Sequence, residues 1–276
     1  MRRLGATAAL ALSLPLTVYP LVWLLGASLR SDAELARDPL GWPRPGALAL
    51  GNYAAAWAQG FGAQLASSTV ISLGAVALTL ALSAPAAYAL ARLAFPGVRA
   101  MTFLFLGGLV VPVQLAVVPL FFQLRSLGLV GTRAGLVLAY AGWSLPFAVL
   151  VLMGAFRALP RSLGEAARLD GATEWGVFFR VMLPCARPSV VAVGLLTLLD
   201  CWNEYLLAFV LLSGQDARGV RTLSLGLADA TMASQYRSDF GVAMAGLVLL
   251  VVPVLVLYVA FSRQLVRGML AGGVKG

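Results

Sequence analysis

The stretch EAARLDGATEWGVFFRVMLPCARP, from Glu165 to Pro188, is a polar helix–turn–helix pattern between two apolar segments of membrane length, 134–156 and 189–213. The first of these segments holds 23 uncharged residues in a row. A helix of about 20 apolar residues crosses the hydrocarbon core of a bilayer, which is about 30 Å thick. The pattern therefore predicts a membrane protein in which this stretch lies outside the bilayer.

The composition of the chain supports several more crossings. Of the 276 residues, 61% are hydrophobic and 11% are charged, which is more apolar side chain than a soluble domain can bury. We expect an all-α membrane protein whose single transmembrane domain covers residues 1–276. The expected parts are spans at about 4–29, 63–91, 100–124, 134–156, 189–213 and 240–262, a cytoplasmic loop at 157–188 and a C-terminal tail at 263–276.

The N-terminal region has some features of a secretory signal peptide. Arg2 and Arg3 precede an apolar run, and Gly26-Ala27-Ser28 is similar to a cleavage region. The uncharged run of 26 residues, 4–29, is longer than the apolar region of an ordinary signal peptide, which has about 7–15 residues. We therefore expect an uncleaved first helix.

The positions of the basic residues predict the orientation. With the N-terminus in the cytoplasm, 12 of the 20 Lys and Arg residues fall in cytoplasmic segments, where such residues concentrate in membrane proteins. We therefore expect both termini to be cytoplasmic. The net charge of +9 then reflects topology, and no nucleic-acid partner is expected. Arg168 and Arg180 are expected to face solvent or the headgroups of membrane lipid.

Several chemical groups are missing from the sequence. It contains no histidine, its only lysine is Lys275, and it has no phosphate-binding loop or nucleophile elbow. Cys185 and Cys201 are too few for a metal site. We expect no catalytic residue, no metal and no cofactor bound by this chain, which leaves a transport pathway, a channel or a scaffold.

The polar stretch itself predicts two short helices that meet at a corner. Gly171 can adopt the positive φ that ends a helix, and Thr173 is a suitable N-cap for the next one. Glu174 is favourably placed at the positive end of that second helix. Pro184 and Pro188 are expected to end it.

The same stretch resembles the permease subunits of ABC importers, whose cytoplasmic loop carries an EAA motif followed by Gly and Pro. Glu165-Ala166-Ala167, Asp170-Gly171-Ala172 and Pro184 carry the resemblance. Its details are similar to the carbohydrate-uptake (maltose/glycerol-phosphate) branch of the binding-protein-dependent transporters. The further segments that carry it are Asn52-Tyr53, Ser67-Ser68-Thr69-Val70, 86–92, 95–97, Trp202-Asn203-Glu204-Tyr205 and 267–276. At Ser67 the family often has Asn.

The resemblance implies a permease in a bacterial plasma (inner) membrane, crossing it several times. Its loop would be a coupling helix–turn–helix that docks on a separate ABC ATPase dimer, where ATP and Mg would bind. A second permease, generally a different one, and an extracytoplasmic sugar-binding protein would complete the importer. The ATPase-coupling residues would be Glu165 as the polar contact, Gly171 as the elbow and Asp170 as a cap or brace, together with Ala166, Ala167, Ala172 and Pro184.

The expected fifth span contains polar residues that are costly in a bilayer. Asp200 and Glu204 lie four residues apart, so we expect them to share one helix face and to point away from lipid. One interpretation is a substrate pathway that binds sugar hydroxyls and the apolar face of the ring. Its residues would be Asp200, Trp202, Asn203, Glu204 and Tyr205. The alternative is that Asn203 and Glu204 hydrogen-bond between helices or subunits.

Three other functions stay open at this point. An ABC permease for amino acids or peptides would lack the resemblance of residues 202–205 and of the tail to the carbohydrate branch. An ion-coupled secondary transporter or channel predicts inverted repeats, which the sequence does not contain convincingly. A membrane enzyme would need the histidine and nucleophile motifs that are missing.

Overall fold

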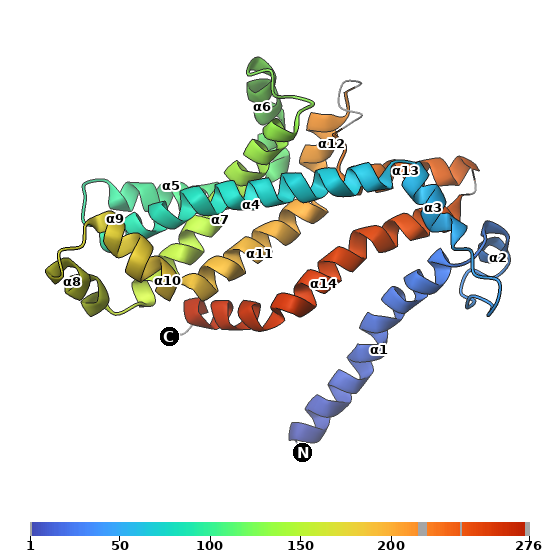
Figure 1. Ribbon diagram of the computed structural model, residues 1–276, viewed down its shortest axis with the longest axis horizontal. Coiled ribbons are helices and arrows are strands. Elements are labelled where there is room, and N and C mark those ends of the chain that lie inside the picture. The colour runs from blue at the N-terminus through green and yellow to red at the C-terminus, as the bar shows by residue number, and fades with distance from the viewer. Residues whose placement is uncertain (1, 215–219, 238, 274–276) are drawn as a thin grey trace. The chain divides into compact units, whose positions relative to one another are not determined.

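The computed structural model describes the backbone of residues 2–214, 220–237 and 239–273, and the side chains of residues 14–214, 220–232 and 239–261. Within this part of the chain every regular element is a helix (Figure 1). The chain divides into two compact units. Unit 1 comprises residues 1–66 and 222–255, and unit 2 comprises residues 67–221 and 256–276.

Unit 1 contains α1 (Arg2–Ser28), α2 (Asp32–Arg37), α3 (Gly51–Ala58), α13 (Leu223–Arg237) and the first part of α14 (Phe240–Gly273). The predicted loop between the first two spans is thus partly helical. Arg30, which is 3% exposed, organises it by donating hydrogen bonds to the carbonyls of Glu34, Asp38 and Gly41. Asn52 donates to two carbonyls at the end of α1, so one residue of the carbohydrate-type motif has a structural role here.

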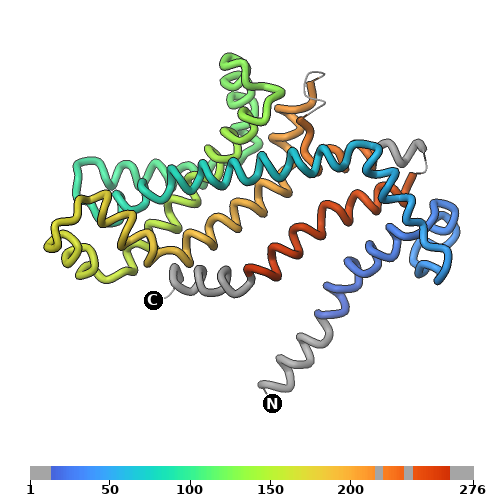
Figure 2. Tube along the Cα trace, viewed as in Figure 1, coloured from blue at the N-terminus to red at the C-terminus, as the bar shows by residue number. Residues whose placement is uncertain are grey.

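Unit 2 is built around α7 (Arg133–Ala158), against which α5 (Val98–Val110), α6 (Val113–Ser126), α11 (Arg187–Asn203) and α12 (Leu206–Leu212) pack. Most of α4 (Phe61–Arg92) also belongs to this unit. The 157–188 loop contains α8 (Arg161–Leu169), α9 (Glu174–Val177), the π-helix η1 (Phe178–Met182) and α10 (Leu183–Cys185). The course of the chain through these elements can be followed in Figure 2.

Three helices among the described residues are long and apolar enough to cross a membrane: Phe61–Arg92, Arg133–Ala158 and Phe240–Phe261. Two bent pairs also pass this test when each pair is taken as one span. They are Val98–Val110 with Val113–Ser126, bent by 105°, and Glu174–Cys185 with Arg187–Asn203, bent by 76°. The described residues therefore provide three to five apolar spans.

Two expected spans are not continuous helices. The predicted span 100–124 breaks at Val111 and Pro112, because a residue that precedes proline is driven out of the α conformation. The predicted span 189–213 breaks at Glu204 and Tyr205, where Glu204 has extended dihedral angles. In both places the charge pattern predicted an uninterrupted helix, and the structure has a break.

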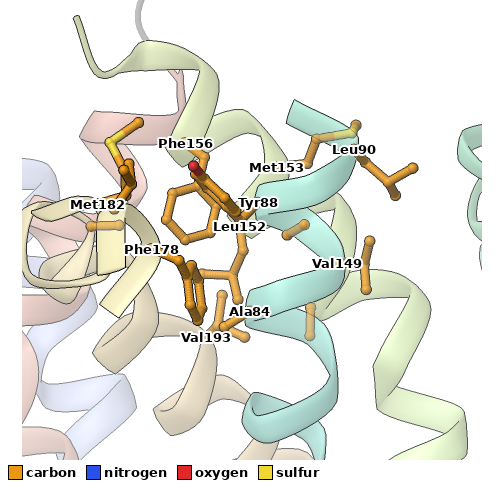
Figure 3. Close-up of a cluster of buried hydrophobic side chains, with 14 residues drawn as sticks. Ala84, Tyr88, Leu90, Val149, Leu152, Met153, Phe156, Phe178, Met182 and Val193 are labelled. Carbon is orange, nitrogen blue, oxygen red and sulfur yellow. The ribbon is translucent and has the colours of Figure 1, made fainter. Parts of the chain in front are cut away.

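A buried apolar cluster connects the loop to three long helices, and we call it the anchoring cluster (Figure 3). The ring of Tyr88 on α4 lies 5.7 Å from that of Phe156 on α7 and 5.2 Å from that of Phe178 on η1. Met182 on η1 and Val193 on α11 belong to the same cluster. The π-helix is thus fixed to the body of unit 2 by large buried side chains.

Candidate functional site

The first helix of the 157–188 loop ends in the predicted way. Gly171 has φ +82°, and its N–H donates to the carbonyl of Arg168 at 3.0 Å. The N–H of Ala172 donates to the carbonyl of Ala167 at 3.0 Å. These two bonds form a Schellman motif, which satisfies carbonyls at the end of α8. The prediction that Gly171 forms the corner is confirmed.

The second helix begins as predicted but ends differently. Thr173 caps α9, with its hydroxyl accepting a hydrogen bond from the N–H of Gly176 at 3.2 Å. Pro184 does not end the helical segment, since it lies inside α10. It lies just after η1, within a helical segment that runs from Glu174 to Cys185. The chain changes direction at Ala186, and Pro188 lies in the first turn of α11.

The predicted coupling residues divide into exposed and half-buried positions. Glu165 and Ala166 are exposed on α8, and among the described residues no hydrogen bond or ion pair holds the Glu165 carboxylate. Ala167 and Ala172 are half-buried against the anchoring cluster. The remaining three, Asp170, Gly171 and Pro184, are exposed. The backbone N–H of Asp170 caps α8 by donating to carbonyls of that helix.

Arg168 is not simply solvated, contrary to expectation. Its Nε donates to Oε1 of Glu174 at 2.6 Å, and its Nη2 donates to Oε2 of Glu174 at 3.1 Å. The hydroxyl of Tyr88 donates to Oε2 of the same carboxylate at 3.1 Å. The hydrogen bonds from Arg168 hold the pKa of Glu174 below its usual value. One carboxylate therefore links α8, α9 and α4.

Arg92 and Arg157 are two of the basic residues in the expected cytoplasmic segments, and both also join helix ends. Arg92 at the end of α4 donates to the carbonyls of Phe156 and Leu159 near the end of α7. In return Arg157 of α7 donates to the carbonyl of Leu90 on α4 at 3.4 Å. Basic side chains are suitable for this role because they satisfy the unpaired carbonyls of a helix C-terminus. The ends of α4 and α7 are thereby joined beside the loop.

A cavity of about 380 Å³ lies between the end of α4 and α8. Arg92, Arg161 and Arg168 line it, together with Glu165 and the ring of Tyr88. The Glu165 side chain therefore borders a polar hollow rather than packing into the anchoring cluster. This is an accessible surface with charges of both signs.

The predicted substrate-pathway residues lie around the break between α11 and α12. Asp200 is exposed, and no hydrogen bond holds its carboxylate within the described residues. Asn203 is exposed and its amide donates to the carbonyl of Leu199 at 2.8 Å. The ring of Tyr205 is stacked on Phe209, with centroids 5.6 Å apart. By contrast, Trp202 is only 6% exposed.

Asp200 and Glu204 have different surroundings, although they lie four residues apart. Glu204 lies beyond the end of α11, and its carboxylate caps α12 by accepting the N–H groups of Leu207 at 2.8 Å and Ala208 at 3.1 Å. Its Oε2 also accepts the hydroxyl of Tyr140 on α7 at 2.9 Å. These bonds favour the break, because a carboxylate at a helix start satisfies otherwise unpaired donors. They agree with the interhelical alternative for this residue.

Sequence reasoning did not identify a second hollow in unit 2. A cavity of about 320 Å³ is lined by residues of α6, α7 and α12, among them Gln123, Trp143 and Leu207. Trp143 is 41% exposed. The sequence shows only that Trp143 lies in an expected span. A single aromatic residue on an apolar helix forms no spacing pattern that would distinguish a cavity from ordinary packing. Among the described residues, no group of acidic or cysteine side chains could hold a metal ion.

Residues 83–270 match the family described as binding-protein-dependent transport system inner membrane component. The chain belongs to this family. The match covers both the 157–188 loop and the break between α11 and α12. It establishes the ABC permease resemblance that the Glu165 motif carried.

Individual relatives agree with this membership. The chain is 40% identical to the diacetylchitobiose uptake system permease protein NgcG of Streptomyces coelicolor, covering 91% of this chain and 82% of the relative. It is 33% identical to the trehalose transport system permease protein SugB of Mycobacterium tuberculosis, covering 94% and 93%. A chain of a bacterial ABC transporter that imports the acidic polysaccharide alginate has the same fold, with a TM-score of 0.79, 23% identity and coverage of 95% and 96%.

Proposed function

We propose that the chain is a membrane-spanning permease subunit of an ATP-driven importer that takes up a sugar, oligosaccharide or polyol. The relatives named for diacetylchitobiose and trehalose uptake support a carbohydrate substrate. The single observation that carries the mechanism is the exposed Glu165 on a short helix whose neighbours are anchored in the body of unit 2. Such a helix presents a fixed polar surface to a partner protein.

The proposed topology has six spans with both termini in the cytoplasm. α1 and the α11–α12 segment would add to the three long helices, and the bent α5–α6 pair would form the remaining span. A single transmembrane domain of residues 1–276 with a cytoplasmic 157–188 loop follows. The predicted tail, 263–276, has side chains outside the described residues, and we carry it as part of this proposal.

The loop would dock on a separate ABC ATPase dimer, which would bind ATP and Mg. Glu165 would be its polar contact, and Asp170 and Gly171 would hold the corner, because a Schellman motif gives α8 a defined end. Ala167 and Ala172 would attach the loop to the anchoring cluster, while Ala166 and Pro184 would lie on its exposed side. ATP hydrolysis would thus take place on another subunit.

The remaining partners follow from the same family. A second, non-identical permease would complete the translocation pathway, and an extracytoplasmic sugar-binding protein would deliver the solute. The importer would reside in the inner membrane of a bacterium. No cofactor would be bound by this chain.

The substrate pathway would include the polar and aromatic side chains at the α11–α12 break. Asp200 and Asn203 offer exposed hydrogen-bonding groups, and Tyr205 offers an aromatic face beside them. Gln123 and Trp143 in the α6–α7–α12 cavity provide the same two kinds of group. Trp202 and Glu204 would support this pathway structurally, since one is buried and the other caps α12.

Reconstitution tests the function. The chain would be assembled in liposomes with the ATPase, second permease and binding protein of neighbouring genes. Labelled diacetylchitobiose, trehalose and glycerol phosphate would be compared with labelled amino acids. ATP-dependent accumulation of a sugar supports the proposal. Accumulation of amino acids alone would replace the substrate class, and accumulation without ATP would overturn the importer assignment.

Cross-linking tests the docking site. The native Cys185 is exposed and would react, whereas Cys201 is buried, so the variants are made in a Cys185→Ser background. In that background Glu165→Cys should form a cross-link to the ATPase. Ser213→Cys, exposed at the end of α12 in the expected outer region, is the matched control. A cross-link at position 213 with none at 165 would contradict the proposed orientation.

A further inference from the structure

α8 has little apolar anchoring of its own. Its only buried residue is Gly164, which faces Val177, whereas Leu163 and Leu169 are 37% and 89% exposed. It packs mainly on α9 and η1, and of its described side chains only Ala167 packs against the anchoring cluster. A displacement of α8 should therefore reach the long helices largely through the elements next to it.

Glu174 is the residue at which these elements meet. Its Oε1 accepts Nε of Arg168, and its Oε2 accepts both Nη2 of Arg168 and the hydroxyl of Tyr88. Arg168 lies in the last turn of α8, and Glu174 is the first residue of α9. The paired geometry fixes the direction of α8 relative to α9, because a guanidinium that donates two bonds to one carboxylate has a defined orientation.

Tyr88 extends this connection into the membrane helices. Its side chain is 4% exposed and contacts the rings of Phe156 and Phe178 in the anchoring cluster. Because Tyr88 is packed in this way, a movement of Glu174 that displaces the Tyr88 side chain should also displace α4 and α7. The contacts run without a gap from α8 through Arg168, Glu174 and Tyr88 to α4.

We propose that Arg168, Glu174 and Tyr88 are positioning residues that transmit the ATPase-driven displacement of α8 to α4. This inference rests on the proposed function of the loop. The side chains of Arg168 and Glu174 are 40% and 47% exposed, and exposed ion pairs contribute little to stability. Their removal should therefore change the transmission of movement while leaving the fold intact.

The direct test measures whether α8 and α4 move together. Spin labels would be placed at Leu169 and Leu82, which are 89% and 50% exposed, in the assembled Cys185→Ser complex. The distance between the labels should stay narrowly distributed with and without ATP–Mg. Glu174→Gln and Tyr88→Phe should broaden it or make it depend on nucleotide. Arg180→Gln, an exposed arginine on η1, should leave it unchanged.

A charge exchange separates positioning from general damage. Arg168→Glu and Glu174→Arg should each raise the ATP hydrolysed per labelled sugar imported by about fivefold or more, the usual lower range of coupling between two sites. The double exchange restores an ion pair and should recover part of that loss. An equal effect of single and double variants, or unchanged distances in every variant, would overturn the proposal.

Failure of the positioning role can be distinguished from failure of the proposed importer function. If the wild-type complex lacks ATP-dependent sugar uptake, the importer assignment fails, while the label distances still report whether the three residues connect α8 to α4. If uptake and ATPase assembly are normal in all variants, with unchanged ATP consumption, only the positioning role fails. Co-elution of the ATPase with each variant verifies assembly.

Discussion

Two glutamates at helix starts in unit 2 each accept a hydrogen bond from a tyrosine on a neighbouring helix. Glu174 accepts the hydroxyl of Tyr88 and the guanidinium of Arg168. Glu204 accepts the hydroxyl of Tyr140 and two backbone N–H groups of α12. The first carboxylate is exposed and paired with a cation, whereas the second is half-buried and holds the backbone itself.

The difference separates a replaceable contact from a structural one. Water can take the place of a lost partner around Glu174, because both side chains of its ion pair are exposed. The donors around Glu204 have less access to water, and Tyr140 is 2% exposed. A loop that moves should therefore be held by exposed ion pairs such as Arg168–Glu174. A break between two packed helices should be held by less exposed contacts such as those of Glu204.

The largest effect is expected at Glu204. Glu204→Ala removes the cap of α12 and leaves the buried Tyr140 hydroxyl unpaired, so the free energy of unfolding should fall by about 3 kcal/mol. Unfolding in mixed detergent micelles measures it. Asp200→Asn, whose side chain is exposed and makes no hydrogen bond within the described residues, is the control and should change stability by less than about 0.5 kcal/mol. If Glu204→Ala and Asp200→Asn lowered the free energy of unfolding equally, Glu204 would have no special structural role.

The corner of the loop should show a smaller effect. Gly171 has φ +82° and open space around it, so Gly171→Ala introduces backbone strain without a clash and should cost about 1–2 kcal/mol. Gly154 in α7 also has open space but no positive φ, and Gly154→Ala should be neutral or slightly stabilising. Thermal unfolding of both variants tests this. A neutral Gly171→Ala would show that the corner tolerates a side chain.

Glu174→Gln should be milder still. The exposed ion pair with Arg168 should contribute less than about 1 kcal/mol to the free energy of unfolding. A micelle unfolding experiment run beside Glu204→Ala compares the two glutamates under one condition. A loss as large as that at Glu204 would mean that Glu174 is structural, and the contrast between the two regions would fail.

The pH dependence of the Arg168–Glu174 pair should be the smallest effect. The hydrogen bonds from Arg168 lower the pKa of Glu174 from 4.5. A lowered carboxyl pKa means that the pair stabilises the fold fully above the unfolded-state pKa and loses this contribution as pH falls through the folded-state value. The difference in melting temperature between wild type and Arg168→Gln should be constant above pH 4.5 and shrink below it. A difference that grows in acid would contradict the pairing.

Sequence reasoning predicted features that depend on local backbone chemistry or on apolar length. Gly171 and Thr173 were identified because a positive φ and an N-cap each require particular residue types. The break between α5 and α6 was missed because the count of uncharged residues ignored Pro112. The effect of Pro112 on Val111 is local and could have been predicted from the sequence. At Glu204, one of the hydrogen bonds to the carboxylate comes from Tyr140 of α7, 64 residues away, and no local pattern encodes that contact.

The contacts of the loop were missed for a similar reason. Arg168 and Glu174 are six residues apart across a corner, so neither helix periodicity nor strand alternation relates them. Arg92 and Arg157 looked like orientation signals because their carbonyl partners lie 64 to 67 residues away in the sequence. The same residue types serve both purposes, and only the packing of α4 against α7 distinguishes them.

In the proposed function, a separate ATPase drives the movement of the loop that bears Glu165. The most direct test of this role is sugar uptake into liposomes that contain the assembled importer with wild-type chain, Glu165→Lys or the control Arg180→Gln. We expect ATP-dependent uptake with wild type and with Arg180→Gln. We expect none with Glu165→Lys, although that chain should be inserted and folded. Normal ATP-dependent uptake with Glu165→Lys would contradict the proposed role of the loop.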